Sequence, residues 1–168
     1  MDTYEYEFSA KLKSHDFGRM AYVVAYLPRV LVKKLPLDEN PRLRIDGEIN
    51  GFRFGNALHP SSGKWYVLVP KKTRKRLRIK LGSEVFIQFN IGDQNAVDVP
   101  RELSRALSIH QKAKAVWNEL TPGKQRGFAY RVDSAKRRET RENRVEEVIG
   151  QLKKLGAGEQ VRRRSRWG

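Results

Sequence analysis

The sequence predicts an α+β protein in which a small N-terminal β-barrel is followed by a C-terminal helical appendage. Two patterns lead to this prediction. Apolar and polar residues alternate repeatedly over residues 4–90, and a period of two is typical of half-buried strands. From Pro100 onward the apolar residues recur at helical spacing instead. A length of 168 residues suits one domain, or one domain with an appendage. We therefore expect a barrel domain over residues 1–92, a helical region over residues 96–156 and a basic disordered tail over residues 157–168.

The first part of the barrel is expected to contain strands at residues 4–13, 20–27 and 42–49. The second of these is the most apolar, which predicts a central position in its sheet. Residues 14–18 are predicted to be a polar turn. Asn50-Gly51 predicts a tight hairpin, because a type I′ turn needs positive φ at both central residues. Phe52 and Phe54 then lie on the returning strand, and residues 59–63 are expected to be a loop.

The stretch from Trp65 to Asn90 is predicted to be a strand, a basic helical connection and a second strand. Tyr66 begins a short apolar run that Pro70 ends, because proline cannot donate to a sheet ladder. Residues 71–80 are crowded with cations. Leu81-Gly82 makes a turn, and residues 84–90 then alternate as a strand.

Part of this stretch repeats a sequence pattern found earlier in the chain, which we call the sequence echo. The segment Ala25-Tyr26-Leu27-Pro28-Arg29 followed by Lys33-Lys34-Leu35 matches Val67-Leu68-Val69-Pro70-Lys71 followed by Lys75-Arg76-Leu77, with equal spacing from proline to leucine. Two such halves could wrap into one barrel with pseudo-twofold symmetry, which would also protect the sheet edges. The echo is short, so coincidence is the alternative.

The strand patterns stop near Asn90, and residues 92–95 are typical of a linker. Amphipathic segments follow, with a proline at the first turn after Pro100 and again after Thr121-Pro122. Their apolar faces are carried by Leu103, Ala106, Leu107, Ala113, Val116, Trp117, Leu120, Phe128, Val132, Ala135, Val145, Val148, Ile149, Leu152 and Leu155. Gly156 is expected to end the last helix.

The formal net charge of +16 predicts attraction to a polyanion, which could be nucleic acid, an anionic membrane surface or an acidic protein. The alternative is that the charge only keeps the protein soluble. The absence of cysteine excludes disulfides, thiolate metal sites and cysteine catalysis. The acidic start shows no secretory signal, and the apolar run over residues 21–27 is too short to span a bilayer. We therefore expect a cytoplasmic protein.

No catalytic constellation is evident. His15, His59 and His110 lack metal-ligand spacing and are interpreted as surface residues. Asp46 and Glu48 share one side of a strand, where ordinary ion pairing is favoured over acid–base chemistry. Residues 61–64 resemble the end of a phosphate-binding loop, but Leu58 stands where that motif needs glycine. We expect no enzyme activity, no cofactor and no metal.

Two basic clusters are the candidate partner-binding sites. The first contains Lys71, Lys72, Arg74, Lys75, Arg76, Arg78 and Lys80. The second contains Lys136, Arg137, Arg138, Arg141 and Arg144, with further arginines in the tail. Such residues can neutralise phosphates and release counterions. The alternative is a solvated face, since Arg138 with Glu142 and Arg144 with Glu147 have spacings that pair locally. The first cluster is favoured because no acid falls between Lys71 and Lys80.

The first part of the chain resembles a bacterial family of small β-barrel domains of unknown function. The resemblance rests on Phe8-Ser9-Ala10, Tyr26-Leu27-Pro28, residues 44–51 (RIDGEING), residues 66–71 (YVLVPK) and Gly82-Ser83-Glu84-Val85. It implies a double-split barrel, related in shape to the swapped-hairpin barrels of AbrB-type transcription factors. The family's Gly-Asp before the last strand is Gly82-Ser83 here.

The second part is similar to the YdeI/OmpD-associated, or bacteriocin-protection, helical region. The matching residues are 99–103 (VPREL), Ala106-Leu107, Leu120-Thr121-Pro122 and, most specifically, 135–141 (AKRRETR). A Trp-Ile pair of that family is Arg131-Val132 here. The resemblance implies a link to resistance against bacteriocins or cationic peptides, with no known reaction.

These observations lead to three hypotheses. The first is a non-enzymatic binding or adaptor protein of the bacteriocin-protection type, which acts through its basic surfaces on a protein partner or anionic surface. The second is a nucleic-acid-binding protein that uses the cluster from Lys71 to Lys80 on an AbrB-like barrel. The third is an enzyme with an unrecognised site in the barrel mouth, which would need convergent polar groups in a pocket.

Overall fold

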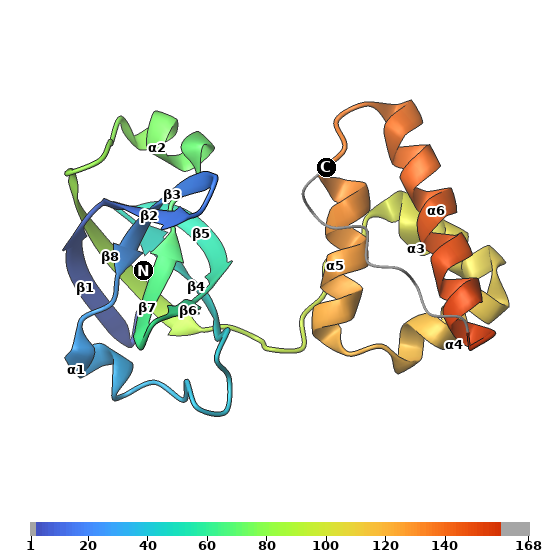
Figure 1. Ribbon diagram of the computed structural model, residues 1–168, viewed down its shortest axis with the longest axis horizontal. Helices are drawn as coiled ribbons and strands as arrows, with labels where there is room; N and C mark the ends of the chain where they lie inside the picture. The colour runs from blue at the N-terminus through green and yellow to red at the C-terminus, as the bar shows by residue number, and fades with distance from the viewer. Residues whose placement is uncertain (1–2, 159–168) are drawn as a thin grey trace. The chain divides into compact units, whose positions relative to one another are not determined.

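The computed structural model describes residues 3–158 and divides the chain into two compact units, Met1–Gln94 and Asn95–Gly168 (Figure 1). The division falls within the linker expected at residues 92–95. Residues 159–168 of the predicted basic tail lie outside the described residues. Each unit is described by itself.

The N-terminal unit contains two antiparallel sheets of four strands. One sheet has the order β1 (Tyr6–Lys11), β8 (Glu84–Ile91), β4 (Arg44–Ile49) and β5 (Phe52–Ala57). The other has the order β2 (Lys13–Phe17), β3 (Met20–Tyr26), β7 (Lys64–Leu68) and β6 (His59–Ser61). The α+β class is confirmed, and so is the central position of β3. The sheets are not joined into one closed ladder within the described residues, so the barrel type stays a prediction.

The two sheets share one apolar core, in which Leu43, Leu58, Ile87 and Phe89 are fully buried. Two short helices, α1 (Arg29–Val32) and α2 (Lys71–Leu77), lie at opposite ends of this unit (Figure 1). Each helix follows a proline, which cannot extend the preceding strand, and each packs one leucine on the core: Leu31 is buried and Leu77 is partly buried. Burial of these leucines holds the helices at the ends of the sheets.

A pseudo-twofold axis relates the two halves of this unit. β3, α1 and β4 form one half of the repeat, and β7, α2 and β8 form the other. Ala25 and Val67 occupy the same position of the sequence echo, and they pair with each other in the centre of one sheet. Gly47 and Phe89 have the same separation in sequence, and they pair in the centre of the other sheet.

The hydrogen bonds beside the axis repeat the same symmetry. Leu27 N donates to Trp65 O, and the equivalent Val69 N donates to Val23 O, both at 2.9 Å. The echo in the sequence is therefore a structural repeat and not a coincidence.

Two segments expected to be turns are strands. Residues 13–17 form β2 and pair with β3, and residues 59–61 form β6 and pair with β7. The actual turns are tighter and use positive φ at Gly18 (65°) and at Ser62-Gly63 (49° and 73°). The prediction was wrong because both strands are at sheet edges, where a polar sequence is tolerated and apolar alternation is not required. The predicted hairpin at Asn50-Gly51 is confirmed, with φ values of 47° and 77°.

The C-terminal unit is helical, as predicted. It contains α3 (Arg101–Ile109), α4 (Gln111–Glu119), α5 (Pro122–Asp133) and α6 (Arg138–Gly156). Thr121 caps α5 by accepting a hydrogen bond from Lys124 N. The predicted apolar faces meet in one core that includes Leu103, Trp117, Val132 and Val148. No helix in residues 3–158 combines the length and the apolar character needed to cross a membrane.

Candidate functional site

The first basic cluster lies on α2 and on the turn that follows it. Six of its seven side chains are exposed. We call the five on α2 and its C-cap the α2 basic surface: Lys71, Lys72, Lys75, Arg76 and Arg78. Leu77 and Ile79 pack against the core, which turns the neighbouring cations outward. Arg78 ends the helix in the left-handed conformation, with φ of 55°. The exposed Lys80 follows in the same loop.

Arg74 differs from the other cations of this cluster because it is half-buried. Its Nε donates a hydrogen bond of 3.1 Å to Val69 O, at the end of the preceding strand segment. Arg74 therefore ties α2 to the sheet.

The α2 basic surface carries uncompensated charge. Among residues 3–158, no carboxylate lies within ion-pair distance of its five side chains. α2 also has no acidic residue in its first turn. The repulsion between these like charges is reduced by water and salt, and an anionic partner would offset it.

The second cluster lies in the helical unit, and much of it is engaged internally. Arg141 makes two parallel bonds to Glu102, with Nε–Oε1 at 2.9 Å and Nη2–Oε2 at 3.1 Å. Its Nη1 donates to the carbonyl oxygens of Asp133 (3.1 Å) and Ala135 (3.2 Å). The hydrogen bond from Arg141 lowers the pKa of Glu102 to about 2. Arg141 thus joins α3, the end of α5 and α6.

The two predicted local pairs have different outcomes. Arg138 and Glu142 form the expected pair at 2.8 Å on the surface of α6. Arg144 does not pair with Glu147, so that prediction was wrong. Arg144 Nη1 instead donates to Arg131 O (2.7 Å) and Ser134 Oγ (2.9 Å), while Glu147 pairs with Arg131. The carbonyls at the end of α5 attract the arginine because they lack partners within their own helix.

Lys136 and Arg137 are the members of the second cluster that stay exposed without an ion pair in the described part of the chain. They precede α6 directly. Within the described part of the chain, the second cluster therefore leaves fewer exposed cations without an ion pair than the α2 basic surface does.

Two of the three histidines are not the plain surface residues that were expected. His15 lies on β2 and His59 on β6, and both are half-buried against the ring of Tyr66. His15 Nδ1 also shares a short hydrogen bond with the hydroxyl of Tyr26. Burial, with a smaller effect of Arg42, lowers the pKa of His59. The sequence interpretation missed this group because both histidines were assigned to turns. His110 remains near a helix boundary, with Lys153 Nζ 3.3 Å from its Nδ1.

Asp46 does not form the ion pair expected for it with any residue in the range 3–158. Its carboxylate lies against Gly55 and Gly92, where a Cβ atom on either glycine would crowd it. The residues described include no group of three or more histidine or acidic side chains that could hold a metal ion.

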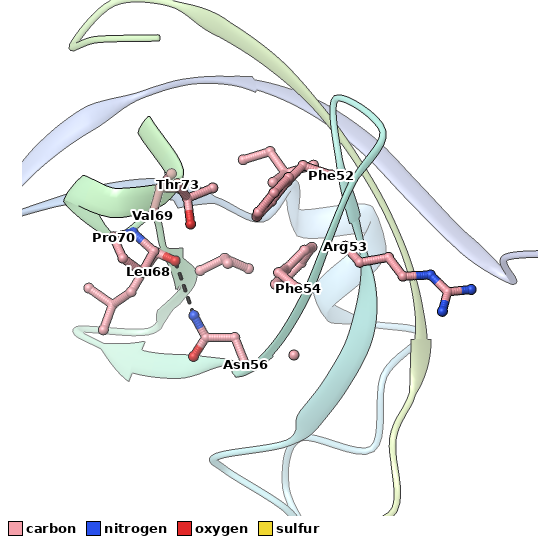
Figure 2. A pocket seen from close by; sticks show the side chains of 11 residues that line it. Phe52, Arg53, Phe54, Asn56, Leu68, Val69, Pro70 and Thr73 are labelled. Atoms are coloured by element: carbon pink, nitrogen blue, oxygen red, sulfur yellow. Dashed lines mark hydrogen bonds between the residues drawn. The ribbon is translucent and has the colours of Figure 1, made fainter. Parts of the chain in front are cut away.

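A pocket of about 210 Å³ opens between β5, the end of β7 and α2 (Figure 2). Its walls are mainly apolar and include Phe52, Phe54 and Val69. Asn56 uses its amide nitrogen to donate to Leu68 O at 3.0 Å, and Thr73 adds a hydroxyl from α2. The described residues that line it include no histidine and no carboxylate. The pocket can therefore enclose a small apolar group, but it offers no acid–base pair.

Comparison with protein families assigns both units. Residues 8–89 match a domain of unknown function, DUF1905, and residues 96–154 match the family described as Bacteriocin-protection, YdeI or OmpD-Associated. The two matches follow one another in the order of an N-terminal domain fused to a C-terminal YdeI-associated region. The division between the matches coincides with the linker, so the region that matches DUF1905 contains the α2 basic surface and the rings of His15, His59 and Tyr66, and the other matched region contains Arg141. No curated protein matches the chain.

Proposed function

We propose that this protein is a non-enzymatic binding protein of the bacteriocin-protection type, which holds an anionic partner on the α2 basic surface. The observation that supports the proposal is the uncompensated charge of Lys71, Lys72, Lys75, Arg76 and Arg78. A polyanion that meets these side chains releases its condensed counterions, which favours binding without requiring a particular sequence or shape.

The cellular role we propose is protection against bacteriocins or cationic peptides, exerted from the cytoplasm. The family match of residues 96–154 supports this role. The helical unit is compact and internally paired through Arg141, Arg144 and Glu147, and it leaves Lys136 and Arg137 exposed. We propose that these two cations supplement α2 in contacting the partner.

We also propose that the DUF1905 unit is a double-split barrel with an AbrB-like shape. The pseudo-twofold relation of Ala25 with Val67 and of Gly47 with Phe89 supports this assignment, because each half contributes strands to both sheets. Nucleic acid is accordingly the second candidate partner, and the rings of His15 and His59 beside Tyr66 on β7 favour it.

The test uses a labelled oligonucleotide backbone without bases, so that only phosphates are offered. We expect the full chain to bind it with an affinity that falls log-linearly with salt. A variant with Lys72, Lys75 and Arg76 all changed to Glu should lose most of this affinity and show a smaller salt slope. A control with Lys112, Lys114 and Lys124 changed to Glu carries the same change in net charge on exposed residues of the helical unit.

Failure to bind at low salt, or equal losses in the variant and its control, would contradict the proposal. The cellular role is tested separately with the same two variants. Cells that depend on the protein for bacteriocin resistance should lose resistance with the α2 variant and keep it with the control.

A further inference from the structure

We propose that the outer face of the sheet formed by β2, β3, β7 and β6 stacks the bases of single-stranded nucleic acid. The inference rests on the proposed function, because it names the partner whose phosphates α2 holds. Its own observation is a group of rings that we call the aromatic face: His15, Tyr22, Tyr26, His59 and Tyr66.

The strand register places these rings together on one side of the sheet. Tyr26 pairs with Tyr66, Tyr66 with His59, and Tyr22 with His15. The core-facing positions of the central strands are taken by other residues, such as Ala25 and Val67. The outer side of a two-layer antiparallel arrangement ordinarily carries polar residues, so a ring on four neighbouring strands is unexpected there.

The rings hold one another in place. Tyr66 is buried at the centre, with the ring of His15 at 4.8 Å, that of His59 at 5.5 Å and that of Tyr26 at 5.9 Å between centroids. His59 stacks on Tyr66 with an interplanar angle of 19°. The hydrogen bond between His15 and Tyr26 also fixes these two rings relative to each other. The four outer rings are half-buried, so each retains accessible surface. Rings ordered before binding lose little entropy when a base packs on them.

Two lysines lie by the aromatic face. Lys64 Nζ lies 5.7 Å from the centre of the Tyr26 ring, and Lys13 is exposed on β2. Asp16 is the one acidic residue in the four strands, and it lies on the edge strand β2. Aromatic rings interleaved with positive charge are the features that bind single strands without sequence preference, because every base has a π-face.

Basic segments also lie at both ends of this sheet. The hydrogen bond from Val69 N to Val23 O places the start of α2 beside the Tyr22 end of β3. The symmetric bond from Leu27 N to Trp65 O places the start of α1 beside the Lys64 end of β7. α1 and the residues after it expose Arg29, Lys33 and Lys34. A strand that crosses the aromatic face would thus meet cations at each end. A duplex keeps its bases paired and stacked inside, so it cannot use these rings.

The test compares two labelled oligonucleotides with equal numbers of phosphates, oligothymidylate and the same backbone without bases. We expect the full chain to bind oligothymidylate roughly 5- to 150-fold more tightly, the range that one stacked base contributes. Tyr26→Ala and His59→Ala should each remove much of this difference and leave the salt slope unchanged. Tyr26→Phe keeps the ring and should keep most of the affinity, which separates stacking from misfolding.

Tyr130→Ala is the matched control, because Tyr130 is 66% exposed on α5 in the other unit. Equal binding of the two oligonucleotides would overturn this inference and leave the proposed function standing. Absence of binding to both would overturn the two together. A preference for oligothymidylate that survives both ring variants would overturn the assignment to this face, as would an equal loss in Tyr130→Ala.

Discussion

Arg141 of α6 and Glu102 of α3 form a bidentate ion pair across 39 positions of sequence, with N–O distances of 2.9 and 3.1 Å. The same guanidinium reaches two carbonyl oxygens at the end of α5. One side chain therefore joins three helices of the helical unit. The residue lies in the AKRRETR run, which as a sequence suggested a charged surface for a partner.

Arg141→Ala is expected to destabilise the helical unit more than Arg138→Ala does. Arg138 makes one exposed pair within its own helix, whereas loss of Arg141 leaves Glu102 and two carbonyls without their donor. Arg141→Lys should recover only part of the loss, because an ammonium cannot form the planar fork. Thermal unfolding of the three variants checks this order, and equal midpoints for Arg141→Ala and Arg138→Ala would contradict it.

Low pH should weaken the ion pair between Glu102 and Arg141. The folded pKa of Glu102 is about 2, below its ordinary value of 4.5, mainly because of the hydrogen bond from Arg141. A lowered carboxyl pKa contributes stability that is present above pH 4.5 and is lost as the pH falls toward 2. Glu102→Gln should reduce this dependence. Carboxyl chemical shifts of Glu102 in a pH titration measure the pKa directly, and Arg141→Ala should return it toward 4.5.

Gly47→Ala is expected to destabilise the DUF1905 unit by about 3 kcal/mol or more, beyond ordinary overpacking. Gly47 pairs with Phe89 on the pseudo-twofold axis, and a Cβ atom there would contact Gln88 O and lie 2.7 Å from Phe89 Cα. Gly150→Ala is the matched control, since nothing lies within 4 Å of a Cβ atom at that helical position. It should stabilise the other unit by about 0.5–1 kcal/mol. Native-state hydrogen exchange measures the stability of each unit separately. Unchanged protection of the amides in the sheet of the Gly47→Ala variant would contradict the expected clash.

The aromatic face should make the stability of its sheet depend on pH. Burial, with Arg42 as a lesser cause, lowers the folded pKa of His59 below its ordinary value of 6.5. The unfolded chain then binds a proton before the folded one does, so stability is complete above pH 6.5 and declines as the pH falls through the folded pKa. His59→Phe keeps a ring on Tyr66 and should flatten this decline. Urea unfolding between pH 7.5 and 5 measures the free energy of unfolding at each pH. If this free energy falls as steeply in His59→Phe as in the unchanged protein, the prediction is wrong.

Local patterns in the sequence determined the order of the elements other than the edge strands β2 and β6. Strand alternation, the Asn50-Gly51 turn, the prolines that end strands and begin helices, and the apolar faces from Leu103 to Leu152 each depend on neighbours within one or two turns of chain. The echo around Pro28 and Pro70 even predicted the twofold relation of the halves, because equal spacing produces equal units.

Only the tertiary structure decided which side chains meet. β2 and β6 became strands because β3 and β7 offer them hydrogen-bonding edges, and their own sequences carry little apolar alternation. That pairing brought His15 and His59 to the same tyrosine. Folding likewise turned Arg141 inward to three helices while it left the cations of α2 outside. Charge is visible in a sequence, but whether a charge is compensated depends on contacts between residues far apart in the chain.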